Sequence, residues 1–374
     1  MKKLFTVYDR YIFSQVLITT VVAILLFTIV WIAPEMLLNT IQKILEGTYT
    51  VKTGVLVLIY ELPKIFGKAF PVGLLLGSLF TFDKLSKDSE LTIFRAVGMS
   101  FFRILAPLLV LSLIFTYLCF ITYDKWIPYS CQKLYEIKGS NTLTQFIYTK
   151  KDANNHPNKA VIVSKFANGI MNDVIVMNFS KEVFSDLHAV SNILVGTTGK
   201  YERDENNNRG WFIYDVTSYN IDDNGIFRKI NRIKKMQILA DNEAEDAYTI
   251  MINSTKRDRD ITNKDLYHYI KLLKRESLDE DYRLMLNKYF QRFFHPFVCV
   301  LLAILGCLLG FSKPREQRLI GFTIAIGCIF LYYITLPFFD LLAEKGVLHP
   351  LITAAFPPAA FLAAIIMFYK SKDL

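Results

Sequence analysis

Six apolar segments, each long enough to cross a lipid bilayer, limit what this 374-residue chain can fold into. A helix needs about 20 mostly apolar residues to span the hydrocarbon of a membrane. The segments of this kind are Tyr11–Ala33, Val55–Phe82, Phe101–Tyr123, Tyr289–Phe311, Leu319–Phe339 and Leu351–Tyr369. A hydrophobic fraction of 52% and a mean hydropathy of +0.30 point the same way. We therefore predict a polytopic α-helical membrane protein with six spans, three before and three after a polar insert.

The charges of the short loops predict how these spans are oriented. One set of loops, which includes both ends of the chain, is basic and contains Lys2, Lys3, Arg10, Lys84, Lys87, Arg95, Arg103, Lys313, Arg315, Arg318, Lys370 and Lys372. The opposite loops are acidic or balanced and contain Glu35, Lys43, Glu46, Lys52, Asp340, Glu344 and Lys345. Because basic loops remain in the cytoplasm, we expect both termini there and the insert outside. The net charge of +9 then reflects membrane topology, and we expect no nucleic-acid partner.

A short charged segment, residues 84–98, joins the second span to the third and has the composition of a helix. Asp88 and Ser89 can cap its start, and Gly98 suits its end. Leu91, Phe94 and Val97 recur at helical spacing and form an apolar ridge along the segment. Membrane pumps receive motion from a soluble ATPase through such surface helices, although a simple helical loop fits the spacing equally well. The candidate ATPase-coupling residues are Glu90, Leu91, Phe94 and Arg95.

The polar insert, residues 125–286, lies between the spans of residues 1–124 and those of residues 287–374, and it has the pattern of a β domain. Six runs alternate with a period of two or are rich in β-branched residues: Gln145–Thr149, Ala160–Lys165, Val174–Phe179, Asn192–Thr198, Trp211–Tyr219 and Ile230–Ile238. Turn sequences separate them, namely Asn154-Asn155, Asn168-Gly169, Asn206-Asn207-Asn208 and Asp222-Asp223-Asn224-Gly225. Such closely spaced strands favour a β-sandwich. The stretch Asn263–Leu286 then becomes helical, with Leu266, Tyr269, Ile270 and Leu273 on one face.

One of the β runs, from Trp211 to Val216, alternates imperfectly between apolar and polar residues. Some of its apolar side chains must then serve a face other than a tightly packed core. Trp211, Ile213 and Val216 are therefore candidates for the wall of an open apolar channel, although an ordinary sandwich interior is at least as good an explanation for each of them.

The second span carries ionisable residues on one helical face. Glu61, Lys64 and Lys68 lie at positions i, i+3 and i+7. Ionisable residues at membrane depth usually face a cavity or a partner, and ammonium groups near the outer leaflet would suit the phosphates of a lipid headgroup. Side chains above the hydrocarbon would instead extend into water. Together with Lys43, the two lysines are the candidate headgroup-binding residues.

The sequence has no pattern of catalytic or metal-binding residues. The five histidines lack ligand spacing, and the five cysteines do not form a disulfide framework. The nearest nucleotide-binding pattern, Gly196–Tyr201, lacks the phosphate-loop spacing and lies in the exported insert. We expect a transporter subunit rather than an enzyme, without metal or cofactor, and ATP hydrolysis on a separate subunit. Because ATP-binding-cassette motors work in pairs and each chain offers one surface helix, two permease chains are expected.

Two blocks of sequence match, in order, a pattern known from one family of membrane transporters. The first block contains Leu62-Pro63, Phe70-Pro71, Leu85-Ser86, Ser89-Glu90-Leu91, Arg95-Ala96-Val97-Gly98-Met99-Ser100, Arg103-Ile104-Leu105 and Pro107. The second contains Lys288, His295-Pro296-Phe297, Gly306, Leu309-Gly310, Gly321-Phe322, Tyr332-Tyr333, Glu344-Lys345-Gly346 and Pro350. Together they resemble the LptF/LptG (YjgP/YjgQ) permease family over nearly the whole chain. Where that family usually has Trp-x-Pro-Asn, this chain has Phe356-Pro357-Pro358.

The resemblance implies a permease subunit of an ABC-type lipopolysaccharide exporter in the bacterial inner membrane, with its insert a periplasmic jellyroll. Such a subunit extracts lipopolysaccharide from the outer leaflet and passes it to a periplasmic bridge. The implied partners are an LptB-like ATPase dimer, LptC-like and LptA-like periplasmic β proteins, and a second permease chain, in a homodimer or an LptF/LptG-type pair. The family often has basic residues near the outer end of the first span. Here that stretch reads Trp31-Ile32-Ala33-Pro34-Glu35, so Lys43, Lys64 and Lys68 would have to replace them.

Two other functional classes fit parts of the sequence. A mechanotransmission-type ABC membrane subunit carries no lipid itself and would need a long exported stalk, whereas Asn263–Leu286 is short. A membrane receptor with a periplasmic β sensor domain would need a cytoplasmic output domain, whereas the cytoplasmic parts here are short tails and loops. The presence or absence of an adjacent ATPase gene and of lipopolysaccharide-transport genes would separate these classes.

Overall fold

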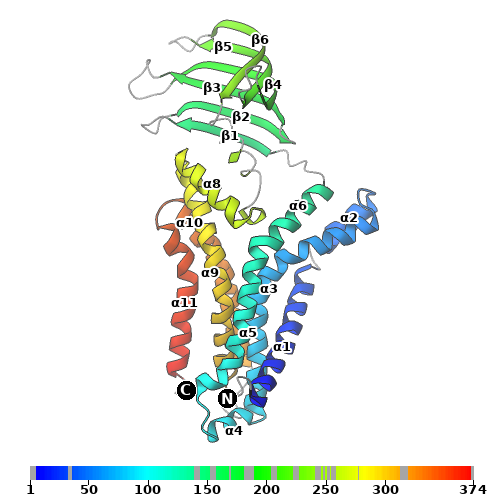
Figure 1. Ribbon diagram of the computed structural model, residues 1–374, viewed down its shortest axis with the longest axis vertical. Coiled ribbons are helices and arrows are strands. Elements are labelled where there is room, and N and C mark those ends of the chain that lie inside the picture. Colours follow the sequence, from blue (N-terminus) through cyan, green and yellow to red (C-terminus); the bar gives the residue numbers. More distant parts are fainter. Residues whose placement is uncertain are drawn as a thin grey trace. The chain divides into compact units, whose positions relative to one another are not determined.

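The computed structural model describes residues 6–32, 36–138, 144–151, 157–167, 170–180, 189–203, 209–221, 227–240, 246, 249–250, 253, 258–276, 278–311 and 319–371. The chain divides into a helical unit, Met1–Ile137 with Arg283–Leu374, and a β unit, Lys138–Tyr282 (Figure 1). Some residues used above lie outside the described ranges: the basic residues Lys2, Lys3, Lys313, Arg315, Arg318 and Lys372, the acidic Glu35, and the four turn sequences of the insert.

The helical unit is built from α1 (Val7–Ile32), α2 (Leu38–Leu45), α3 (Val51–Lys87), α4 (Glu90–Ala96), α5 (Phe101–Ile121), α6 (Ile127–Lys138), α9 (Asp279–Gly310), α10 (Leu319–Glu344) and α11 (Pro350–Ser371). In the described ranges, six helices are long and apolar enough to cross a membrane: α1, α3, α5 continued by α6, α9, α10 and α11. The six predicted spans are therefore confirmed. The third runs further than expected, because a π-helical turn at Thr122–Trp126 connects α5 to α6 without a break.

The central helix of this unit is α3, and small residues let it approach two neighbours closely (Figure 1). Gly73 and Gly77 of α3 face α1, where a Cβ on Gly77 would lie 2.2 Å from the Thr20 hydroxyl. Gly306 and Gly310 of α9 face α3 in the same way. Both pairs have the four-residue spacing with which spanning helices gain van der Waals contact, since lipid supplies no hydrophobic force between them. The first three spans are thus joined to the last three through the contact of α3 with α9.

Pro71 inside α3 removes a helical hydrogen bond, and a side chain of a neighbouring helix bonds to the carbonyl that is left without its helical partner. Pro71 has no N–H, so the carbonyl of Gly67 lacks its usual helical partner. The buried thiol of Cys119 in α5 donates to this carbonyl, with 3.8 Å between sulfur and oxygen. One residue further on, the hydroxyl of Tyr333 in α10 donates to the Lys68 carbonyl at 3.0 Å. These bonds tie the middle of α3 to both halves of the bundle.

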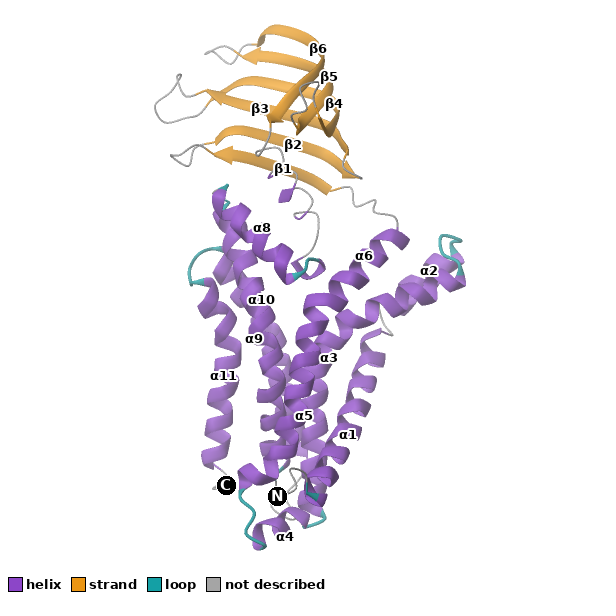
Figure 2. Ribbon diagram, in the orientation of Figure 1, coloured by secondary structure: helices purple, strands orange, loops and turns teal. Residues whose placement is uncertain are grey.

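The β unit contains β1 (Thr144–Lys151), β2 (Pro157–Ala167), β3 (Ile170–Ser180), β4 (Ala189–Arg203), β5 (Arg209–Ile221) and β6 (Phe227–Ala240). Each of the six predicted β runs lies within one of these strands. All six form one antiparallel sheet whose strand order follows the chain (Figure 2). The predicted β domain between the two sets of spans is therefore confirmed. Its described strands form a single antiparallel meander, whereas the sequence led us to expect a β-sandwich.

A line of interrupted pairing crosses this sheet. It passes through Ser164, Asp173, Thr197, Asp215 and Lys234, one residue on each strand from β2 to β6, and the register is the same on both sides of it. Asp173 and Asp215 have φ values of 53° and 50°, in the left-handed region that ordinary strand residues avoid. The backbone therefore bends at the same level in successive strands.

The bend explains the imperfect alternation of the run from Trp211 to Val216. Residues three apart face opposite sides of a flat strand, yet pairs that straddle the line are buried together. These pairs are Val163 and Phe166, Met171 and Val174, and Ile213 and Val216. The two parts of the bent sheet thus turn their apolar side chains toward a common core.

The stretch after the strands forms α8 (Asn263–Arg275), which Thr262 caps through its hydroxyl. The apolar face expected from the sequence is buried and consists of Leu266, Tyr269, Ile270 and Leu273. The predicted helix to Leu286 is interrupted, because α8 ends at Arg275 and α9 begins at Asp279. Tyr148 of β1 donates to the carboxylate of Glu276 at 2.8 Å, which fixes the end of α8.

Candidate functional site

The surface helix α4 lies at the end of the helical unit where both ends of the chain also lie (Figure 1). It connects α3 to α5 and is shorter than the predicted segment 84–98, because α3 continues to Lys87 and α4 covers only Glu90–Ala96. Gly98, at φ 86°, ends the helix as expected: its N–H bonds to the Arg95 carbonyl at 2.9 Å. The next N–H, of Met99, bonds to the Phe94 carbonyl at 3.1 Å, which completes a Schellman motif. The expected cap at the start is wrong, because Ser89 has φ 59° and its side chain makes no capping hydrogen bond.

Two of the predicted coupling residues hold α4 onto the bundle. Leu91 is buried in the same apolar cluster as Ile12 and Val16 of α1. The ring of Phe94 meets the ring of Tyr8 edge to face, with 4.8 Å between centroids. These contacts make Leu91 and Phe94 anchors of α4, and the predicted role of both residues in ATPase coupling stays a prediction.

The opposite face of α4 is open and partly apolar. Ile93 is 58% exposed and Val97 is 78% exposed. Arg95 is also exposed, but two residues from Ile93 and from Val97 it points to a different side of the helix. Sequence reasoning missed Ile93, although its spacing of four residues from Val97 places the two on adjacent turns of one face.

Glu90 is bound within the chain. Its carboxylate accepts a hydrogen bond from the hydroxyl of Tyr11 in α1, with 3.0 Å between the oxygens. The carboxylate is half-buried at the first turn of α4, where the positive end of the helix dipole favours it. It is therefore positioned by α1 and still accessible to a partner.

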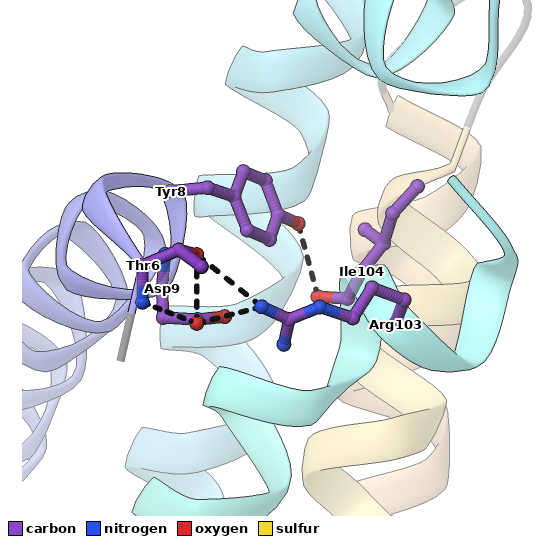
Figure 3. Close-up of polar contacts among 5 residues, drawn as sticks. All are labelled: Thr6, Tyr8, Asp9, Arg103 and Ile104. Carbon is purple, nitrogen blue, oxygen red and sulfur yellow. Dashed lines mark hydrogen bonds and ion pairs between the residues drawn. The ribbon is translucent and has the colours of Figure 1, made fainter. Parts of the chain in front are cut away.

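A second polar cluster lies beside α4, at the start of α1 (Figure 3). Thr6 and Asp9 form a capping box: the Thr6 N–H donates to Asp9 Oδ2 at 2.9 Å, and the Asp9 N–H bonds to Thr6 Oγ1 at 3.4 Å. Arg103, in the first turn of α5, donates from Nη2 to Asp9 Oδ2 at 2.7 Å and to Thr6 Oγ1 at 3.2 Å. Tyr8 donates to the Ile104 carbonyl at 3.2 Å. The sequence holds one signal for this cluster, an acidic residue at the start of an apolar span.

The predicted headgroup residues occupy two separate settings at the other end of the helical unit. On α3, Lys64 donates to Glu61 at 3.0 Å, and both side chains are largely buried. This is the pairing that their spacing predicts. Lys43 belongs to α2, where its ammonium lies 3.4 Å from the Tyr49 hydroxyl and 5.1 Å from the centre of that ring. Lys68 is half-buried one turn beyond Lys64.

In the β unit, Trp211, Ile213 and Val216 are fully buried. Ile213 and Val216 belong to the pairs that straddle the bend, and Trp211 packs against Tyr201 with 5.6 Å between ring centroids. The structure thus brings the three residues together in a closed core, where an apolar lipid path would have to open.

Comparison with known proteins places this arrangement in a family. No curated protein matches the chain. The model of the family described as "Lipopolysaccharide export system permease LptF/LptG" matches residues 10–371, which is almost the whole chain. The match covers all six spanning helices, α4 and the β unit. The protein therefore belongs to the LptF/LptG family of lipopolysaccharide export permeases.

Proposed function

We propose that this multi-pass membrane protein is the permease subunit of an ABC-type exporter, which takes lipopolysaccharide from the outer leaflet of the bacterial inner membrane to a periplasmic bridge. The observation that carries the proposal is α4, a surface helix anchored by Leu91 and Phe94 whose outer face exposes Ile93 and Val97. ATP hydrolysis takes place on an LptB-like dimer, and a second permease chain supplies the second α4. LptC-like and LptA-like β proteins receive the lipid.

The test of this function is purification of the permease with its candidate ATPase, followed by measurement of ATP hydrolysis. We expect lipopolysaccharide to stimulate hydrolysis and an equal amount of a neutral phospholipid to have little effect. Hydrolysis indifferent to lipopolysaccharide would contradict the proposal and favour a mechanotransmission-type subunit. Failure to bind any ATPase would favour a receptor.

The proposed orientation places α4 and both termini in the cytoplasm and the β unit in the periplasm. Basic residues at the α4 end, such as Lys84, Lys87 and Arg95, support this orientation. A membrane-impermeant thiol reagent should label a cysteine introduced at Asp215 in intact spheroplasts, and one introduced at Thr92 only after lysis. The reverse labelling pattern would contradict the proposed orientation.

For α4 we predict that a charge on its open face prevents ATPase binding. Val97→Glu places a carboxylate where an apolar contact with the ATPase is proposed, and Glu90→Ala removes the carboxylate proposed to pair with a basic residue of the ATPase. Loss of one partner of a buried pair costs about 2–5 kcal/mol, so we expect co-purification to fall at least about tenfold. The matched control is Val347→Glu, which is 66% exposed in the turn between α10 and α11. Normal co-purification with Val97→Glu would exclude this face as the docking surface.

For the periplasmic path we propose that lipid acyl chains enter the core of the bent sheet beside Trp211, Ile213 and Val216. A photo-crosslinking residue at Ile213, which is fully buried, should capture lipopolysaccharide only while the ATPase is active, because lipid can reach this position only when the core opens. The matched control carries the photo-crosslinking amino acid in place of Thr217, which lies beyond the bend and on the opposite side of β5 from Val216. Equal capture at both positions, or capture at neither during active transport, would contradict the path.

A lipid headgroup is proposed to bind near Lys64, Lys68 and Lys43. The support is the Glu61–Lys64 pair, in which a carboxylate holds one ammonium in a largely buried site until a phosphate competes for it. Such competition gives a bound state that is released when the carboxylate recaptures the lysine.

A further inference from the structure

The first two turns of α1 carry α4. The ring of Tyr8 supports Phe94, and the hydroxyl of Tyr11 holds the carboxylate of Glu90. Leu91 is buried in the apolar cluster to which Ile12 of the same helix also belongs. Any displacement of α4 therefore pushes directly on the start of α1.

The ion pair between Asp9 and Arg103 fixes that start against α5. The side chain of Asp9 is 4% exposed, whereas that of Arg103 is 41% exposed, so the base reaches from the surface to a carboxylate withdrawn from water. Oδ2 of Asp9 accepts from the Thr6 N–H, the Thr6 hydroxyl and the Arg103 guanidinium (Figure 3). Capping the start of α1 needs only the bond from the Thr6 N–H, because a cap serves to satisfy unpaired backbone N–H groups at the helix start. The bond to Arg103 adds a connection between two helices.

From α1 the connection continues to α3. The hydroxyls of Thr19 and Thr81 lie 2.7 Å apart, and Thr19 also donates to the Gly77 carbonyl at 3.0 Å. The 37 residues of α3 form one continuous helix, about 55 Å long at 1.5 Å per residue. Its far part carries Glu61 and Lys64. A movement of α1 is thus passed to the helix that bears the charged face.

We propose that Asp9 and Arg103 are positioning residues that lock α1 to α5 around α4, so that movement imposed on α4 reaches α3 instead of being absorbed by a loose α1. The proposal rests on the function proposed above. Neither residue touches the lipid or the ATPase in this role. Their loss should therefore separate ATP hydrolysis from lipid release while leaving ATPase binding intact.

The test uses the full permease complex reconstituted in vesicles with lipopolysaccharide and a soluble periplasmic β acceptor. Asp9→Asn keeps the shape and an acceptor for the Thr6 N–H but removes the charge. We expect ATPase binding to stay within about twofold of wild type. Lipid released per ATP should fall about tenfold, the size expected for loss of a charged hydrogen bond whose Arg103 side remains partly exposed. Hydrogen exchange at the amides of α4 should accelerate. Arg103→Lys, which keeps the charge, should release more lipid per ATP than Arg103→Gln.

A matched control is the pair of Lys133 and Glu136 in α6, whose side chains are exposed and 2.7 Å apart. Glu136→Gln should change neither readout, because exposed pairs contribute little. Normal lipid release per ATP in Asp9→Asn, or equal defects in Arg103→Lys and Arg103→Gln, would overturn the lock. If Asp9→Asn does not accumulate, the two Arg103 variants decide. A wild-type complex that releases no lipopolysaccharide would refute the proposed function and not the lock. In that case the lock is tested by hydrogen exchange alone, and exchange at the α4 amides that is unchanged in the variants would refute it.

Discussion

A single methyl group on Gly306 is expected to disrupt the helical unit, whereas the same change at Gly327 should be silent. A Cβ on Gly306 would lie 2.2 Å from the Ser78 hydroxyl and 2.3 Å from the Leu75 carbonyl oxygen. Ser78 can rotate away, but the carbonyl is part of the backbone of α3. Overpacking of this kind costs about 1–3 kcal/mol, and a larger side chain costs more. Gly306→Ala should lower the thermal midpoint of the purified protein, and Gly306→Leu should prevent its accumulation as a monodisperse species.

The control for this prediction is matched in chemistry. Gly327 lies in a spanning helix, α10, and a Cβ there would have no neighbour within 4 Å. Gly327→Ala should therefore leave the midpoint unchanged or raise it, since alanine is the better helix former. Equal midpoints for the two alanine variants would mean that α3 and α9 do not pack as closely as described.

Reversal of the two lysine charges on α3 is expected to abolish the stimulation of ATP hydrolysis by lipopolysaccharide. In Lys64→Glu with Lys68→Glu, carboxylates would face the phosphates that ammonium groups are proposed to bind. Like-charge contacts of this kind cost several kcal/mol, so stimulation should fall more than about tenfold while ATPase binding persists. Arginine at both positions should be better tolerated, because the charge is retained although the geometry changes.

A variant of Glu61 should have the opposite effect on lipid binding. Glu61→Gln frees Lys64 from its partner at 3.0 Å, so lipid should bind more tightly and leave more slowly. The matched control is a double reversal on α8, Lys271→Glu with Lys274→Glu, in the β unit. If lipopolysaccharide still stimulates ATP hydrolysis normally in the Lys64→Glu, Lys68→Glu variant, the two lysines do not bind the headgroup. They would then be side chains that extend from the membrane into water.

The spans, the strands and the site of α4 could be predicted because each depends on a local property. Length and hydropathy identify a spanning helix, and alternation identifies a strand, whatever the neighbours are. The face of α4 that remains open could not be predicted in the same way. Leu91 and Ile93 are both apolar, and only the packing of Leu91 into the apolar cluster of the helical unit determines which of them is buried.

Two further features depend on residues that are distant in sequence. The pair of Asp9 and Arg103 joins residues 94 positions apart, and neither residue has a local pattern that indicates the other. The bend in the sheet is a property of several strands at once. Asp173 and Asp215 read as ordinary polar positions in their own strands, so the phase shift that buries both Ile213 and Val216 had no visible cause in the sequence.

The most direct test of the central claim is transfer of lipopolysaccharide by the reconstituted permease. Vesicles containing the protein, its ATPase and labelled lipopolysaccharide are mixed with a soluble LptA-like acceptor, and the label on the acceptor is followed after ATP is added. The proposed function predicts transfer that requires ATP and is lost with Val97→Glu but not with Val347→Glu. Hydrolysis of ATP with the label remaining in the vesicles would contradict it.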